Sequence, residues 1–221
     1  DDESCDVVRF FTQLKCRMMP YLYREAARAN ARGTPMMRAM MMEFPDDPAC
    51  DYLDRQYMLG DNVMVAPVFT EAGDVQFYLP EGRWTHLWHN DELDGSRWHK
   101  QQHSFLSLPV YVRDNTLLAL GNNEQRPDYA WHEGTAFHLF NLQDGHEALC
   151  EVPAADGSVI FTLKATRTGN TITVTGAGEA KNWTLCLRNV VKVNGLQGGS
   201  QAESEQGLVV TPQGNALTIT L

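Results

Sequence analysis

QYMLGDNVMVAPV, residues 56–68, marks the point at which the chain changes from helical to β patterning. Ahead of it, Asp47 precedes Pro48, an arrangement that predicts a capped short helix running to Leu59. Gly60 would end that helix, and the apolar run at residues 63–68 is typical of a strand. From Asn62 onward we therefore expect a mainly β protein.

The first 32 residues predict one long helix, over residues 4–32. Apolar side chains recur at three- and four-residue steps and form a stripe along it: Val7, Phe10, Phe11, Leu14, Met18 and Leu22. Acidic residues precede the helix, basic residues weight its second half, and Gly33 is suited to end it. Pro20 lies inside and should kink the helix or divide it. A helix with so long an apolar stripe needs a large surface to pack against.

Several strands are expected between the helix and residue 120. The apolar run 36–43, flanked by Pro35 and Pro45, is expected to be a buried strand. Further strands are expected at 63–68, at 75–79, in a segment with Trp84 and Trp88, and as a pair at 108–112 and 116–120. The polar stretch 121–128 is the expected domain boundary.

The last part of the chain predicts a second β unit. Short strands are expected at residues 136–140, 159–163, 171–175, 183–187, 208–210 and 216–221. Turns containing glycine and asparagine separate them, and the polar segment 197–207 is expected to be a loop. Regular short strands with such turns predict a β-sandwich.

The formal net charge of −10 argues against binding nucleic acid or an anionic membrane surface, because both require clusters of Lys and Arg. No apolar run approaches the ~20 residues needed to span a bilayer, and the N-terminus lacks the basic region of a signal peptide. Five widely spaced cysteines without a C-x-x-C motif predict free, mostly buried thiols in a reducing compartment, and hence a cytoplasmic protein: Cys5, Cys16, Cys50, Cys150 and Cys186.

The densest acidic stretch invites a catalytic interpretation, because a pair of carboxylates can serve as nucleophile and general acid. It consists of Glu43, Asp46, Asp47, Asp51 and Asp54. Helix capping and solvation explain the group better, since Asp47 directly precedes Pro48 and acids favour the first turn of a helix. We therefore expect a structural role for Asp47.

The seven histidines suggest a metal site only weakly. His86 and His89 are three residues apart and His99 and His103 four apart, spacings that share a face on a helix. However, His86 and His89 fall in a β segment, where an offset of three directs side chains to opposite faces. No acid or cysteine stands at ligand spacing beside them, so we expect no metal.

The aromatic residues could form a platform on which sugar rings stack, or could be core and inter-domain packing. The candidates are Tyr78, Trp84, Trp88, Trp98, Tyr111 and Trp131. Packing is the expected role, because large aromatic side chains dominate burial.

Five groups of segments, taken in order, resemble the C-terminal third of a family 31 glycoside hydrolase, in particular a bacterial α-xylosidase. They are MPYLY (19–23), GTP (33–35) with EFPDD (43–47), QYMLG (56–60) with VAPV (65–68), LPEGRW (79–84) and LPVYVR (108–113). The residues after Arg113 depart from the family pattern, which has a glycine there. Asn115 can stand for a glycine that needs a positive φ.

The resemblance implies a parent enzyme with a (β/α)₈ barrel that would lie upstream of Asp1. It implies that residues 1–34 are the last barrel helix, 35–120 a proximal β domain and 121–221 a distal β-sandwich. The family's two catalytic aspartates would also lie upstream of Asp1, so no catalytic, cofactor-binding or metal residue is expected in this chain. The implied reaction removes terminal non-reducing α-D-xylosyl residues with retention and without a cofactor. The implied partners are the rest of the barrel enzyme, an α-xyloside substrate and further copies of the protein, as a homo-oligomer.

Other interpretations remain open. An α-glucosidase of the same family would share these segments, because the residues that select the sugar are not among them. A free-standing carbohydrate-binding module would use its tryptophans, and an assembly module would use the distal sandwich.

Overall fold

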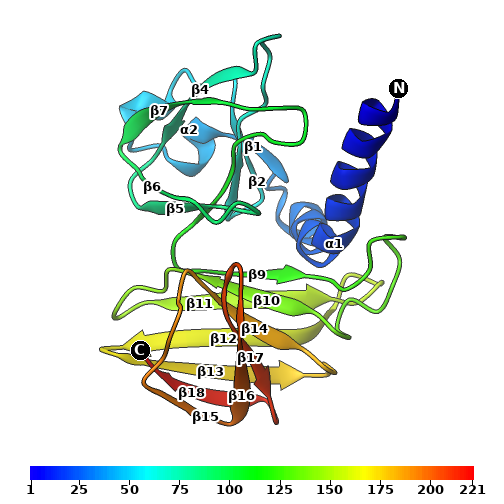
Figure 1. Cartoon of the computed structure of the whole chain (residues 1–221), viewed down its shortest axis with the longest axis vertical. Helices are drawn as coiled ribbons and strands as arrows, with labels where there is room; N and C mark the ends of the chain where they lie inside the picture. The colour runs from blue at the N-terminus through cyan, green and yellow to red at the C-terminus, as the bar shows by residue number, and fades with distance from the viewer. The chain divides into compact units, whose positions relative to one another are not determined.

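The computed structural model describes all residues, 1–221, and they divide into two compact units. The first unit consists of Asp1–Phe10 and Arg28–Asp114, and the second of Phe11–Ala27 and Asn115–Leu221. Strands dominate both (Figure 1). The expectation of a mainly β chain that begins with a helix is therefore confirmed.

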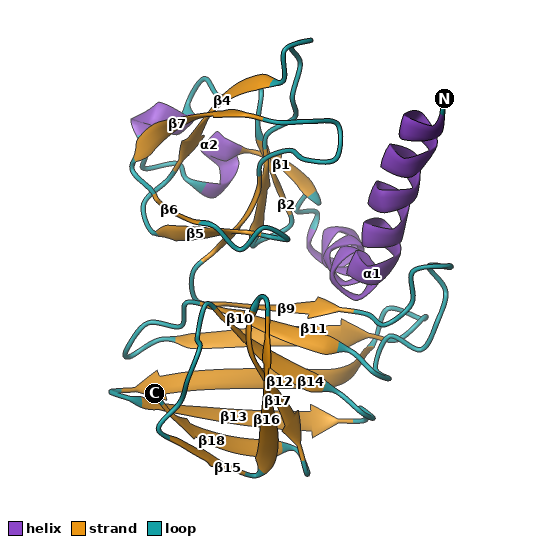
Figure 2. Ribbon diagram, in the orientation of Figure 1, coloured by secondary structure: helices purple, strands orange, loops and turns teal.

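Helix α1 spans Asp2–Arg32: it begins two residues earlier than predicted and ends at the predicted residue, before Gly33. The Asp1 carboxylate accepts a hydrogen bond from the Ser4 N–H at 2.8 Å, which satisfies one of the free donors of the first turn. At the other end Gly33 adopts a left-handed φ of 72°, and its N–H donates to the Ala29 carbonyl. Pro20 lies inside, and Figure 2 shows the ribbon of α1 changing direction along its length.

The first unit is built on an antiparallel six-stranded sheet with the order β1-β2-β3-β8-β5-β6. Its strands are β1 (Met37–Ala39), β2 (Tyr57–Leu59), β3 (Val63–Val65), β5 (Arg83–His86), β6 (Glu92–Asp94) and β8 (Val110–Arg113). A separate antiparallel pair consists of β4 (Asp74–Leu79) and β7 (Arg97–Gln102). Side chains such as Met58, Met64, Phe77, Trp84 and Tyr111 fill one core between these layers.

Two expectations for this unit were wrong. The run 36–43 is not one strand, because β1 ends at Ala39 and a single helical turn, α2 (Met40–Glu43), follows. Met and Ala are poor strand formers, so this turn agrees with their propensity. The capped helix after Asp47 is only a 3₁₀ turn, η1 (Pro48–Cys50), and residues 57–59 form the strand β2.

The second unit is a sandwich of two five-stranded sheets, as predicted. One sheet has the order β16-β17-β14-β10-β9, with β9 (Thr116–Leu120), β10 (Ala136–Phe140), β14 (Thr184–Arg188), β16 (Gly199–Ser204) and β17 (Gly207–Pro212). The other has the order β11-β12-β13-β18-β15, with β11 (Glu147–Pro153), β12 (Val159–Thr168), β13 (Thr171–Gly178), β15 (Gly195–Gln197) and β18 (Ala216–Thr220). The segment 197–207 is thus largely strand rather than loop.

Alternation along the strands explains the core of the sandwich. In β12, Phe161, Leu163 and Ala165 are buried while their neighbours are more exposed, and β13 buries Ile172 and Val174 in the same way. These side chains share one core with the inward residues of β10 and β14, including Phe137 and Leu185.

The strands on either side of Asn115 are not a pair, contrary to expectation. Strand β8 pairs with β3 and β5, whereas β9 pairs with β10. Asn115 itself has a φ of 53°, which confirms that it takes a conformation usually reserved for glycine. Its side chain accepts a hydrogen bond from the Gln143 N–H at 2.8 Å and so belongs to the second unit.

The middle of α1 is attached to the second unit by hydrogen bonds and an ion pair. The Gly121 N–H donates to the Arg17 carbonyl at 2.7 Å, and the Tyr129 hydroxyl donates to the Cys16 carbonyl at 2.8 Å. Arg24 forms an ion pair with Glu151 in which both side chains are mostly buried. These contacts fix residues 11–27 as part of that unit.

Candidate functional site

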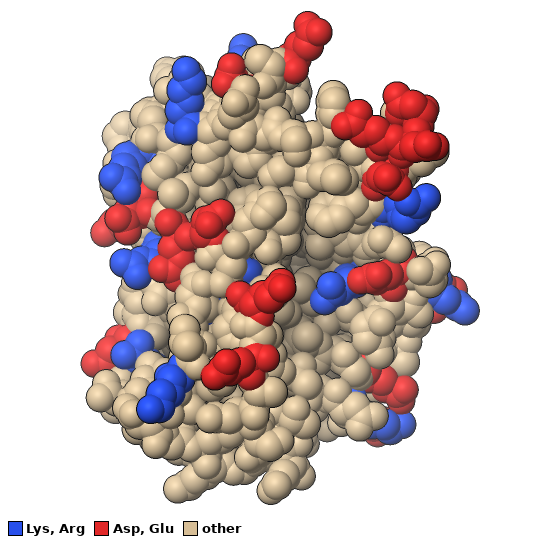
Figure 3. All heavy atoms as spheres, in the orientation of Figure 1, with Lys and Arg blue, Asp and Glu red and all other residues tan.

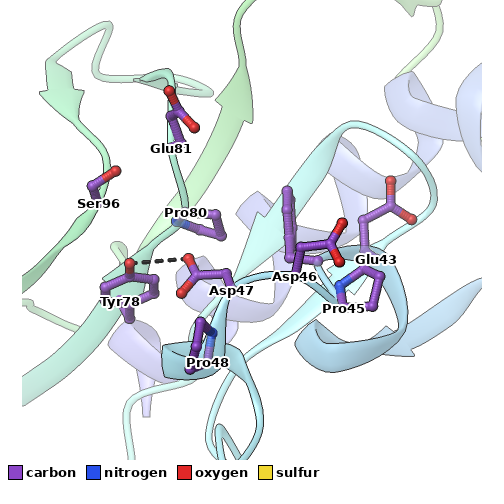
Figure 4. A pocket seen from close by; sticks show the side chains of 10 residues that line it. Glu43, Pro45, Asp46, Asp47, Pro48, Tyr78, Pro80, Glu81 and Ser96 are labelled. Carbon is purple, nitrogen blue, oxygen red and sulfur yellow. Dashed lines mark hydrogen bonds between the residues drawn. The ribbon is translucent and has the colours of Figure 1, made fainter.

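An acidic pocket of about 450 Å³ lies in the first unit (Figure 4). Its residues come from α2 and the turn that follows, from η1, and from the end of β4 and the loops beyond. They are Glu43, Phe44, Pro45, Asp46, Asp47, Pro48, Tyr78, Pro80, Glu81 and Ser96. The pocket thus gathers three of the five acids that the sequence singled out.

Asp47 is engaged through both carboxylate oxygens. Oδ1 accepts from the Ala49 N–H at 3.0 Å and caps η1, which confirms the predicted cap. Oδ2 accepts from the Tyr78 hydroxyl at 3.0 Å, the bond drawn dashed in Figure 4. Burial, together with this bond and the charge of Asp47, raises the pKa of Tyr78 to about 12. Tyr78 therefore stays protonated and keeps donating to Asp47.

Glu43 belongs to a row of alternating charges. Its Oε2 accepts from Arg38 Nη1 at 2.6 Å and its Oε1 from Arg113 Nη1 at 3.3 Å. Arg38 also donates to Asp61 Oδ1 at 2.6 Å, and the other Asp61 oxygen accepts from Arg28. Burial would raise the pKa of Asp61, but the hydrogen bond from Arg38 and the three surrounding guanidinium charges outweigh it, so that this pKa is lowered.

In the acidic pocket, the carboxylates of Glu43 and Asp47 therefore have structural roles. A glycosidase needs one carboxylate to attack or stabilise the sugar and another to donate a proton. Both oxygens of Glu43 and of Asp47 are already bound by protein groups. The role of Glu43 in the ion-pair row was missed: Arg38 lies only five residues away, but Arg113, which completes the row, comes from a strand seventy residues further along the chain. Asp51 and Asp54 are exposed outside the pocket.

A second pocket, of about 410 Å³, is rich in histidine. It is lined by His86, His89, Asp91, Gln101, Gln102, His103, Ser107 and Tyr111. His86 and His89 share this pocket, with ring centroids 4.7 Å apart, although strand alternation predicted opposite faces. The reason is that β5 ends at His86 and residues 87–89 form a turn, so the two-residue period does not apply.

The other histidine pair is separated. His103 lines the pocket, whereas the His99 ring stacks on Phe77, and its Nε2 lies 2.9 Å from the Asp94 carbonyl. Both nitrogens of His86 are occupied, by the Leu108 carbonyl at 3.0 Å and by the His89 N–H at 3.2 Å. No group of three or more potential metal ligands converges in the structure.

The aromatic candidates serve mainly as packing. Trp84 and Tyr111 are each 1% exposed, and the Trp84 indole donates to the Pro80 carbonyl at 2.9 Å. Trp131 packs on Tyr23 in the second unit, with ring centroids 4.7 Å apart. Trp98, at 52% exposed, is the one strongly exposed member of the group. The six do not form a shared platform.

The cysteines are all free, and four of the five are buried. Cys5 is the exposed one, so the expectation of free, mostly buried thiols is confirmed. Burial first, and then the charges of Asp47 and Asp51, raise the pKa of Cys50 to about 11, so this thiol is inert. None of the helices combines the length and the apolar character that crossing a membrane requires. Acidic and basic side chains are interspersed on the face in Figure 3, with acids at the start of α1.

Comparisons with known proteins agree with this architecture. A family model described as "Glycosyl hydrolase family 31 C-terminal domain" matches residues 33–118. A second family model, described as "Alpha-xylosidase YicI, C-terminal domain", matches residues 130–221. The α-xylosidase XylQ of Lactiplantibacillus pentosus is 33% identical over 80% of this chain and 24% of its own length. An α-xylosidase of Emericella nidulans is 39% identical over 57% of this chain and 17% of its own length. The chain thus spans a quarter or less of these relatives.

A solved structure shows the same fold. The family 31 dextranase of Flavobacterium johnsoniae, complexed with glucose, superposes with a TM-score of 0.78 at 21% identity, over 95% of this chain and 32% of that one. α-Glucosidases also match, for example one from Bacillus thermoamyloliquefaciens at 27% identity over 63% of this chain. The two matches together cover most of both units, at residues 33–118 and 130–221. The chain therefore belongs to glycoside hydrolase family 31 and carries the C-terminal β domains of that family.

Proposed function

We propose that this chain is the C-terminal structural portion of a retaining α-glycosidase that hydrolyses terminal, non-reducing α-D-xylosyl residues from xylosides. One observation carries the choice of sugar: residues 130–221 match the C-terminal domain described for an α-xylosidase. The α-xylosidase relatives support the same choice.

The proposed chemistry takes place outside these 221 residues. A retaining enzyme uses two carboxylates and two displacements, through a covalent glycosyl-enzyme, and needs no cofactor. We propose that both carboxylates are aspartates on a barrel upstream of Asp1. The occupied oxygens of Glu43 and Asp47 support this assignment, because neither side chain is available to attack a sugar or to protonate a leaving group.

The proposed role of each part follows the resemblance. Residues 1–34 would be the last barrel helix, residues 35–120 the proximal β domain and residues 121–221 the distal sandwich. Strand β9 (Thr116–Leu120), at the end of the second range, pairs with β10 and so lies in a sheet of the sandwich. The apolar stripe of α1 supports a barrel contact: Phe10, Phe11 and Leu14 are only half-buried, whereas Met18 and Tyr21 further along are buried. An apolar stripe left partly open is suited to pack against another layer.

A cytoplasmic homo-oligomer remains part of the proposal. The five free cysteines support a reducing compartment, since secreted proteins tend to pair their thiols. Subcellular fractionation and the particle mass of the purified enzyme test these two points. A single-copy particle would reject the oligomer, and recovery from an oxidising compartment would reject the cytoplasm.

Hydrolysis by the full-length enzyme tests the substrate. We expect kcat/KM for p-nitrophenyl α-D-xyloside to exceed that for the α-D-glucoside at least tenfold. A reversed preference would make the enzyme an α-glucosidase, the second candidate, which the α-glucosidase relatives favour. Retention is read from the anomer released first, by NMR.

Two truncations test the structural role. Residues 1–221 expressed alone should fail to give a soluble, cooperatively folding product with α1 intact, because the helix would lack its barrel. A well-folded product would contradict the barrel-closing role. Deleting residues 121–221 and recovering a smaller but active particle would instead assign the sandwich to assembly.

A further inference from the structure

The chain contains a single Asn-Gly step, at Asn194 and Gly195. Asn194 is exposed and lies in the bend that leads into the three-residue strand β15. An asparagine followed by glycine readily loses its side-chain amide, because glycine has no Cβ to keep its backbone nitrogen away from the asparagine Cγ. The step is therefore a candidate for spontaneous chemical change.

The fold does not require glycine at position 195. The φ of Gly195 lies outside the left-handed region that favours glycine. A Cβ at this residue would lie 3.5 Å from Thr220 Oγ1, which is an ordinary van der Waals distance. Alanine would therefore fit, so the main effect of a glycine here is on the reactivity of its neighbour.

Strand β15 is lightly held by its sheet. It lies at the edge and pairs with β18 alone, through three residues, Gly195–Gln197 (Figure 1). The connector before it is open, since Val191 is 77% exposed. A short strand with one neighbour opens at a low free energy, because few contacts hold it. Local opening of β15 would bring the Asn194 side chain within reach of the Gly195 nitrogen without unfolding of the sandwich.

Two hydrogen bonds join Asn194 to the end of β18 and the residue after it. Its N–H donates to the Thr220 carbonyl at 2.7 Å, and its side-chain Nδ2 donates to the Leu221 carbonyl at 2.7 Å. The second bond requires an amide, because an ionised carboxylate only accepts. Conversion of the amide to a carboxylate would leave two oxygens facing each other and would turn this attraction into a repulsion.

We propose that Asn194 is a site of spontaneous deamidation, and that its conversion to a carboxylate releases β15 from β18. The Gly195 backbone nitrogen attacks Asn194 Cγ, so that an N–Cγ bond forms and the Cγ–Nδ2 bond breaks. Ammonia leaves with the proton of the attacking nitrogen, and water then opens the cyclic imide at either carbonyl to give aspartate or isoaspartate. Isoaspartate also lengthens the backbone by one carbon, which disturbs the pairing of Gly195 with Thr220.

Mass spectrometry of the full-length protein during storage in neutral buffer tests the chemistry. Trypsin cuts after Lys192 and yields a peptide that carries both Asn194 and Asn215. Asn215 is exposed and directly precedes β18, as Asn194 precedes β15, but its following residue is alanine. We expect Asn194 to deamidate at least tenfold faster than Asn215. Equal rates at the two residues would overturn the proposal.

A glycine variant separates chemistry from structure. Gly195→Ala should slow the loss of the Asn194 amide at least tenfold and leave the melting temperature unchanged, because the added Cβ hinders the attack but fits the fold. Gly214→Ala is the matched control, since its Cβ would also meet no obstacle, and it should leave the rate at Asn194 unchanged. An unchanged rate in Gly195→Ala would show that this step is not what makes Asn194 reactive.

A variant with the product's charge tests the release of β15. In Asn194→Asp, hydrogen exchange of the peptide that spans β15 should be at least fivefold faster than in the wild type. Asn215→Asp adds the same charge at an exposed position beside the same sheet and should leave that exchange unchanged. Wild-type exchange in Asn194→Asp, or equal acceleration in both variants, would contradict the release.

Both measurements are independent of the proposed glycosidase function. Hydrolysis of α-glycosides is assayed on the same samples, so that the two proposals fail separately. A protein that hydrolyses an α-xyloside but keeps the Asn194 amide would defeat the deamidation proposal alone.

Discussion

Gln56 forms two hydrogen bonds with the backbone of Tyr78, one with each of its polar groups. Its Nε2 donates to the Tyr78 carbonyl at 2.7 Å, and its Oε1 accepts from the Tyr78 N–H at 2.8 Å. Gln56 is 6% exposed, and it supplies to β4 the two bonds that a neighbouring strand would supply. Both bonds depend on an amide, because only an amide side chain offers a donor and an acceptor at this spacing.

Replacing Gln56 by Leu should therefore be strongly destabilising. The substitution leaves a buried N–H and a buried carbonyl without partners, which costs about 2–5 kcal/mol in the free energy of unfolding. Gln213→Leu, at an exposed turn, is the matched control and should change stability by less than about 0.5 kcal/mol. Urea unfolding measures both, and equal stability of the two variants would refute the role of Gln56.

Asp61→Asn should weaken the charge row in the first unit. We expect a loss of about 1–2 kcal/mol at pH 7, a modest figure because Asp61 is about a third exposed and partly screened by solvent. The pKa of Asp61 is lowered in the folded state, so its contribution is present above the unfolded value of 3.8 and is lost as the pH falls through the folded pKa.

The difference between wild type and Asp61→Asn should accordingly shrink as the pH falls below 3.8 and through the lowered pKa of folded Asp61. Chemical denaturation at pH 7 and at pH 3 measures it, with exposed Asp54→Asn as the control. If the stability difference between the two proteins is the same at pH 3 as at pH 7, the charge of Asp61 is not what stabilises the charge row.

His138 should make the second unit sensitive to mild acid. It is 5% exposed and lies 3.4 Å from Arg188, and burial first, then the charges of Arg188 and Arg17, lower its pKa to about 3. Folded His138 stays neutral while the unfolded side chain takes up a proton below about pH 6.5. Stability is therefore full above that value and falls as the pH decreases toward the folded pKa, by up to about 1.4 kcal/mol per pH unit.

Removing the imidazole should flatten this pH dependence. His138→Gln keeps an acceptor for Arg188 but cannot titrate between pH 7 and pH 4. The melting temperature measured across that range should fall less steeply than in the wild type, whereas exposed His146→Gln should keep the wild-type slope. Identical slopes in all three proteins would contradict the assignment to His138.

Asp47→Asn should leave catalysis in the full-length enzyme nearly intact. Asn caps a helical turn about as well as Asp, and the weakened bond from Tyr78 costs about 1 kcal/mol of stability. We expect kcat/KM for an α-xyloside to remain within about twofold of the wild type. A loss of several thousand-fold would instead mark Asp47 as a catalytic carboxylate.

Local signals in the sequence identified the elements whose partners lie nearby. The stop at Gly33 and the cap at Asp47 both depend on atoms a few residues away. The sandwich strands were recognisable because burial alternates along them, as in β12. The same reasoning failed at His89, where a turn begins one residue after His86 and changes which side chains meet.

What the sequence alone determined is the class of this protein: an N-terminal helix, a mainly β chain and membership of glycoside hydrolase family 31. These follow from periodicity, capping residues and short motifs, all of which act over a few residues. Tertiary structure alone decided that Gln56 serves Tyr78, that Glu43 joins Arg38 to Arg113, and that His89 and His103 meet at Ser107. The physical reason is that the contacts of Gln56 with Tyr78, of Glu43 with Arg113 and of His89 with Ser107 join segments brought together only by strand order and packing, which local patterns do not encode.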